Sequence, residues 1–156
     1  MYKFFDSKWK YFIVVLAIAL VAGLGSLFVN LGMDWFSTLN KPSRFVPSFV
    51  FGIVWSVIYI TFAIIICLWI RKEKLPKSTF ILLIVNGVLN VLWCLLFFTL
   101  NNTILGLVAI VLNLIAAIIL WINMFKFKPV YAYITSIYPI WISLATCLNL
   151  ALWILN

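Results

Sequence analysis

Five apolar segments without a single Asp, Glu, Lys or Arg make up most of this 156-residue sequence. They cover residues 11–33, 47–70, 79–100, 104–125 and 130–155. A helix needs about 20 apolar residues to cross the hydrocarbon core of a bilayer, and helices keep every backbone polar group paired there. The sequence therefore predicts an all-α membrane protein, in which residues 1–156 form a single domain, a bundle of five transmembrane helices.

The composition excludes a water-soluble domain. Hydrophobic residues make up 67% of the chain and charged residues only 9%, whereas soluble domains carry about 25% charged residues. The few cations lie in short stretches between the apolar segments, so the net charge of +8 indicates membrane topology rather than nucleic-acid binding. The first segment follows three lysines, as in a signal peptide, but its length favours a membrane helix.

The positions of Lys and Arg predict the orientation. Nine of the eleven cations fall on one side, before the first segment and after the second and fourth: Lys3, Lys8, Lys10, Arg71, Lys72, Lys74, Lys77, Lys126 and Lys128. Lys41 and Arg44 fall on the other side. Because cytoplasmic loops carry the excess of cations, we expect a cytoplasmic N-terminus, a C-terminus outside, and an outer loop over residues 34–46 in a cell membrane.

The sequence lacks histidine, and its only carboxylates are Asp6, Asp34 and Glu73. This excludes Ser-His-Asp and Cys-His catalytic arrangements, histidine metal sites and a haem iron held by a proximal histidine. We therefore expect no metal site and no required cofactor.

Three predicted helices carry aromatic and amide side chains at helical spacing, which places each set on one face. The sets are Trp55, Tyr59 and Phe62; Asn86, Asn90, Trp93 and Phe97; and Tyr138, Trp141, Ala145 and Asn149. All three sets reach roughly 10–15 Å below the outer helix ends, too deep for the interfacial belt. We assign Trp69, Trp121 and Trp153 to that belt. The deep sets fit either a cavity for a small molecule or core packing with Asn bridging neighbouring helices.

Two further patterns predict local structure. In the first segment, small residues recur four apart, Ala19 with Gly23 and Ala22 with Ser26, a spacing that lets helices approach closely. We expect this spacing to serve packing inside the bundle, with a dimer contact as the alternative. Pro139 lies inside segment 130–155 and should kink that helix or loosen its hydrogen bonds.

Three stretches of the sequence resemble the translocator protein family, also called tryptophan-rich sensory protein (TspO/MBR). The first, "WFSTLNKPSRFVPSFVFGIVWSVIY" (35–59), is similar to the family signature W-x-x-L-x-K-P-x-W-x-P-P and the second helix that follows it. The others are "LNVLWCLLFF" (89–98) and "YPIWISLATCLN" (138–149), which resemble the third and fifth helices. Their order and the five segments match along nearly the whole chain.

The resemblance implies a five-helix bundle, often a homodimer, that binds tetrapyrroles such as protoporphyrin IX and synthetic benzodiazepine-type ligands. Some members degrade porphyrin in light. Carried over residue by residue, the pocket role passes to Trp55, Asn90, Trp93, Trp141 and Ala145, with Trp55 and Trp141 as the candidates for photochemistry. The alternatives are a passive transporter of porphyrins or lipids and a regulatory or scaffold protein tuned by its ligand.

The chain also departs from the family pattern. Arg44 stands where the family usually has Trp, Val46 replaces a proline, and Val111 replaces a common acidic residue. The end of the sequence, "LNLALWILN", lacks the Tyr and cation of the proposed sterol motif, so sterol binding through it has no support.

Segment 34–46 is expected to be a lid over the pocket, anchored by Pro42 and Pro47, with Arg44 pairing with a ligand carboxylate. The predicted ligand contacts are Trp35, Phe36, Arg44, Trp55, Tyr59, Asn90, Trp93, Phe97, Tyr138, Trp141, Ala145 and Asn149.

Overall fold

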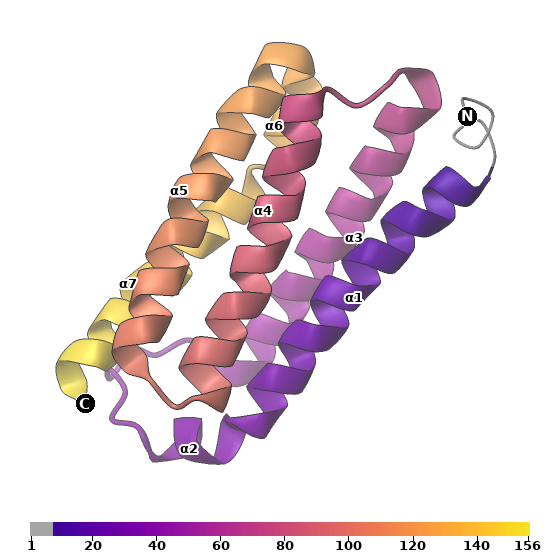
Figure 1. Ribbon diagram of the computed structural model, residues 1–156. Coiled ribbons are helices and arrows are strands. Elements are labelled where there is room, and N and C mark those ends of the chain that lie inside the picture. The colour runs from indigo at the N-terminus through magenta and orange to yellow at the C-terminus, as the bar shows by residue number, and fades with distance from the viewer. Residues whose placement is uncertain (1–7) are drawn as a thin grey trace.

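The computed structural model describes residues 8–156 as five long helices lying side by side (Figure 1). They are α1 (Trp9–Leu31), α3 (Ser48–Lys72), α4 (Lys77–Cys94) with the π-helical turn η2 (Leu95–Thr99), α5 (Thr103–Phe127), and α6 (Pro129–Thr135) with α7 (Ile137–Leu155). Each is long and apolar enough to cross a membrane. The prediction of an all-α, five-helix membrane protein is confirmed, and the predicted segments lie within a few residues of these bounds.

The two ends of the bundle differ in charge. Helix α2 (Met33–Thr38), the loop 39–47 and the C-terminus lie at one end, which we call the α2 end (Figure 1). The start of α1 and the α3–α4 and α5–α6 connections lie at the other, which we call the cation-rich end. It carries all the predicted cytoplasmic cations among residues 8–156; Lys3 lies outside the described residues.

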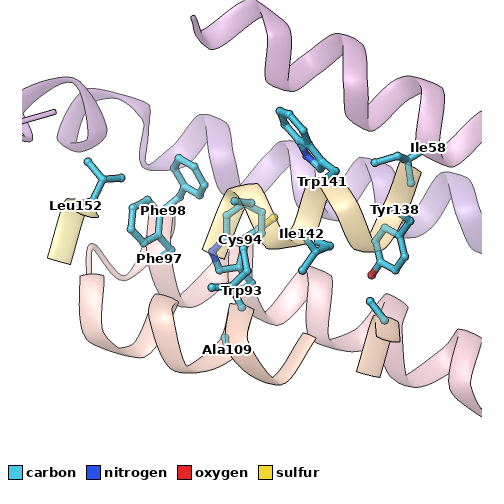
Figure 2. Close-up of a cluster of buried hydrophobic side chains, with 13 residues drawn as sticks. Ile58, Trp93, Cys94, Phe97, Phe98, Ala109, Tyr138, Trp141, Ile142 and Leu152 are labelled. Atoms are coloured by element: carbon cyan, nitrogen blue, oxygen red, sulfur yellow. The ribbon is translucent and has the colours of Figure 1, made fainter. Parts of the chain in front are cut away.

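The core runs along the bundle axis. Helix α5 packs against α4 and α7, α1 packs against α4 and α3, and α3 also contacts α6 and α7. The larger buried cluster includes Trp93, Phe97, Tyr138 and Trp141 (Figure 2). A second cluster around Trp69 lies towards the cation-rich end. Trp69 is only 1% exposed, so its assignment to the interfacial belt was wrong: its ring packs against Tyr131 instead of facing lipid.

The fifth segment breaks at Ser136, between α6 and α7. Pro139 lies three residues further on and has no N–H to donate to the carbonyl of Thr135, so one helical hydrogen bond is missing there. The backbone tightens at the same point, where the N–H of Ser136 donates to the carbonyl of Tyr133 at 3.3 Å. The predicted loosening of the helical hydrogen bonds near Pro139 is confirmed.

The π turn η2 is a feature that the periodicity of segment 79–100 did not predict. The N–H of Leu100 donates to the carbonyl of Leu95, five residues back, at 2.9 Å. This wider turn lets the neighbouring Phe97 and Phe98 both point into the core (Figure 2). Two glycines pack closely against this turn. A Cβ on Gly32 would overlap the backbone of Phe98, and a Cβ on Gly106 would overlap the ring of Phe97.

The small residues of α1 do not pack inside the bundle as expected. Ala19 is exposed, and a Cβ placed on Gly23 would meet no atom within 4 Å. Ala22 and Ser26 line a cavity. The expectation of internal packing was therefore wrong for the Ala19–Gly23 pair, because those residues lie on the outward side of α1. The buried residue of α1 is Gly25.

Candidate ligand-binding cavity

A cavity of about 420 Å³ lies between the helices at the α2 end, partly open between α1 and α3, where Ser26, Gly52 and Ser56 are exposed. Its walls come from α1, α3, α4, η2 and α7, and α2 and the following loop close it with Phe36 and Phe45. The volume falls within the range of about 300–1,000 Å³ that is typical of small-molecule sites. None of the residues lining it is Lys, Arg, Asp or Glu.

One wall of this cavity is a continuous row of aromatic rings. Tyr59 and Trp55 stack with ring centroids 5.7 Å apart, and Trp55 lies 6.2 Å from Trp93. Trp93 then stacks on Phe97 at 6.5 Å, and Phe97 meets Phe98 edge-on at 4.8 Å. The row makes this wall aromatic and apolar, which suits a flat, apolar ligand.

Amide side chains fix the orientation of this wall. The indole N–H of Trp93 donates to Oδ1 of Asn149 at 3.2 Å, and Nδ2 of Asn149 donates to the carbonyl of Ala145 at 2.9 Å. Nδ2 of Asn90 donates to the hydroxyl of Tyr59 at 3.2 Å. The side-chain oxygen Oδ1 of Asn90 accepts no hydrogen bond from residues 8–156. It is therefore able to accept one from a ligand.

The predicted lid consists of the short helix α2 followed by an extended loop. Lys41 holds the two together, because its Nζ donates to the carbonyls of Phe36 at 2.7 Å and Leu39 at 3.2 Å and lies 4.6 Å from the centre of the Phe36 ring. The loop is also tied to the end of α7: the N–H of Asn40 donates to Oδ1 of Asn156 at 2.8 Å, and Nδ2 of Asn156 donates back to the carbonyl of Asn40 at 3.0 Å. These contacts anchor the loop; anchoring by its prolines stays a prediction.

A second, larger cavity of about 1070 Å³ lies between α1, α3 and α4 towards the cation-rich end. Sequence reasoning did not find it. Tyr59 and Asn90 line both cavities, so their hydrogen bond is part of the wall between them.

The chain matches the TspO/MBR family model over residues 12–154. It belongs to the TspO/MBR family. It is 29% identical to the tryptophan-rich protein TspO of Archaeoglobus fulgidus, over 91% of this chain and 94% of that protein. It is 28% identical to Protein CrtK of Rhodobacter capsulatus, over 78% of each chain. It is also 28% identical to the uncharacterized membrane protein YtaB of Bacillus subtilis, over 88% of this chain and 89% of that protein.

The cavity at the α2 end contains three of the residues to which the TspO/MBR resemblance gave a pocket role, Trp55, Asn90 and Trp93. Phe36, Tyr59, Phe97 and Asn149 line it as well. The cavity wall also includes Phe45, Phe51 and Phe98, which sequence reasoning missed. Their only signal was their aromatic character, and the inward direction of Phe98 depends on the π turn.

The other five predicted contacts of this TspO/MBR protein do not line the cavity. Trp35 packs edge-on against Phe97 at 5.4 Å, and Arg44 is exposed. Trp141 is buried beside Phe51, with ring centroids 5.3 Å apart, and Ala145 is buried in the same cluster.

Tyr138, the last of the five, is buried deeper in the bundle. Its hydroxyl lies 3.1 Å from Oδ1 of Asn86 and 3.2 Å from Oδ1 of Asn113, so it donates to one of the two amides. It lines the second cavity.

Proposed function

We propose that this protein binds a metal-free tetrapyrrole such as protoporphyrin IX in the cavity at the α2 end. The observation that carries the proposal is the uncharged cavity with its row of Tyr59, Trp55, Trp93 and Phe97 rings. Stacking on indole and phenyl faces favours a flat macrocycle. The chain has no histidine to ligate an iron, so a free porphyrin suits it better than haem.

The carboxylates of a porphyrin would lie towards the outer surface, because the cavity offers them no cation. Of the two cations at the α2 end, Lys41 is engaged with the carbonyls of α2. Arg44 is exposed at the loop and can grip a carboxylate through two hydrogen bonds. We therefore assign it to a propionate when the loop closes on a ligand.

Titration of the purified protein in lipid nanodiscs with protoporphyrin IX tests the function. Tryptophan fluorescence should be quenched in a saturable way that reaches one porphyrin per chain, since Trp55 and Trp93 form the cavity wall. Empty nanodiscs serve as the control for porphyrin that only partitions into lipid. Quenching that follows this partitioning without saturation would mean that the cavity does not bind porphyrin.

The orientation expected from the cation count is part of the same proposal: the cation-rich end faces the cytoplasm and the α2 end faces outward in the cell membrane. A cysteine-reactive, membrane-impermeant reagent added to intact cells should then label Ser43→Cys in the exposed loop. It should not label Lys126→Cys at the other end before the cells are broken. The reverse pattern would place the cavity on the cytoplasmic side.

Passive transport of porphyrin is the second candidate function. It is favoured by one observation, that the two cavities lie towards opposite ends of the bundle and share Tyr59 and Asn90. The described spans contain no charged residue within their apolar segments that could couple transport to protons. Protein-dependent release of protoporphyrin from liposomes without an ion gradient would support this role, and binding without release would exclude it.

A further inference from the structure

The cavity at the cation-rich end is a long apolar groove. Its lining on α3 extends from Ile58 to Lys72, which corresponds to roughly 20 Å along the helix. Facing residues come from α1, such as Val14 and Ala17, and from α4, such as Leu83. The groove therefore has the length and polarity to accept an extended hydrocarbon chain.

The side of this groove opens towards lipid rather than water. Along its membrane-spanning part, the groove is lined by four apolar residues that are half exposed or more: Ile13 on α1 and Phe80, Ile84 and Val88 on α4. They belong to segments that cross the membrane. Because a bilayer surrounds these segments, the molecules that meet the opening are bilayer lipids.

The end of the groove nearest the membrane surface carries an excess of positive charge. Lys10, Arg71, Lys72 and Lys74 line it together with one carboxylate, Glu73. That carboxylate forms an ion pair with Lys128 of the α5–α6 connection. The groove thus combines an apolar interior with a cationic mouth.

The last turn of α3 would otherwise repel an anion at this mouth, since the C-terminal carbonyls of a helix carry partial negative charge. Lys10 of α1 offsets this, because its Nζ donates to the carbonyl of Ile70 at 3.1 Å. Arg71 and Lys72 follow directly and are both exposed.

From these features we propose that the groove is a binding site for an anionic phospholipid of the surrounding bilayer. One acyl chain lies between α1, α3 and α4, and the phosphate contacts Arg71 and Lys72. This site is separate from the porphyrin cavity, and the proposal does not depend on porphyrin binding. The lateral opening within the hydrocarbon region favours a bilayer lipid over a water-soluble acid as the occupant.

Electron spin resonance of spin-labelled lipids in reconstituted membranes tests the proposal. Phosphatidylglycerol labelled near the end of one acyl chain should show an immobilised fraction with a higher affinity than labelled phosphatidylcholine. In the double variant Arg71→Gln/Lys72→Gln, the preference for phosphatidylglycerol should fall roughly tenfold, because each of the two cations attracts the anionic headgroup. Lys126→Gln is the matched control: it removes an exposed cation at the same end that does not line the groove.

A second pair of variants tests the acyl chain. Ala17→Trp should fill the groove and release the immobilised chain, whereas Ala19→Trp should not, because Ala19 lies on the same helix but outside the lining. Unchanged thermal unfolding of both variants would show that they remain folded. Equal affinity for the two lipids, equal losses with Lys126→Gln, or immobilisation that survives Ala17→Trp would each overturn the proposal. So would a preference for labelled stearate without one for phosphatidylglycerol, which would identify a free fatty acid as the occupant.

Discussion

Replacing Gly32 by alanine is expected to destabilise the α2 end by more than about 3 kcal/mol. Overpacking a core costs about 1–3 kcal/mol when side chains can adjust. Here the added methyl group would overlap the carbonyl group and Cα of Phe98, which belong to the backbone of η2 and cannot rotate away. Either the junction of α1 and α2 or the π turn must shift, and the cavity residues Phe36 on α2 and Phe97 and Phe98 on η2 would move with them. Thermal unfolding in detergent, followed by tryptophan fluorescence, measures the loss.

Gly23→Ala is the matched control on the same helix. A Cβ at Gly23 would meet no atom within 4 Å, and alanine is a better helix former than glycine by about 1 kcal/mol. This variant should therefore be as stable as the parent protein or slightly more stable. A Gly32→Ala protein that unfolds at the parent temperature would show that η2 and α1 do not approach as closely as described.

Filling the cavity from α1 should weaken porphyrin binding while the bundle stays folded. A Cβ on Gly25 would lie 3.5 Å from Sγ of Cys94 and 3.9 Å from the hydroxyl of Tyr59, which are ordinary contact distances. The longer side chain of Gly25→Leu would extend into the space that these residues line. We expect the dissociation constant for protoporphyrin IX to rise roughly ten- to a hundredfold, since a misfit of about 1–3 kcal/mol corresponds to that range.

A leucine at Gly23, two residues away, separates the filling of the cavity from a general disturbance of α1. Gly23→Leu adds the same side chain to the same helix but does not line the cavity. It should bind porphyrin with the affinity of the parent protein. Equal binding by both variants would place the porphyrin elsewhere, and equal loss in both would indicate disturbed packing of α1.

The sequence predicted the five helices and the level of the site because both depend on local patterns. Continuous apolar character defines a transmembrane helix, and a spacing of three or four residues places Asn90, Trp93 and Phe97 on one face. The inward direction of Phe98 does not follow from such spacing. It requires the π turn, which depends on the absence of side chains at Gly32, between α1 and α2, and at Gly106 in α5.

The position of Trp141 shows a second limit of sequence patterns. It shares a helical face with Asn149, yet Asn149 lines the cavity and Trp141 packs behind Phe51 of α3. The same limit explains why the lipid-facing groove was missed: most of its lining residues are Ile, Val, Leu and Phe, which a membrane helix also presents to ordinary lipid.

The hydrogen bond between Tyr59 and Asn90 makes the two cavities opposite sides of one wall. An occupant on either side that turns one of these side chains changes the shape offered to the other occupant. Thermodynamic linkage then requires reciprocity: the factor by which a groove lipid alters porphyrin affinity equals the factor by which porphyrin alters lipid affinity. Lipid composition would in this way act as an allosteric effector of the porphyrin site, and Tyr59→Phe, which removes the shared hydroxyl, would bring that factor towards one.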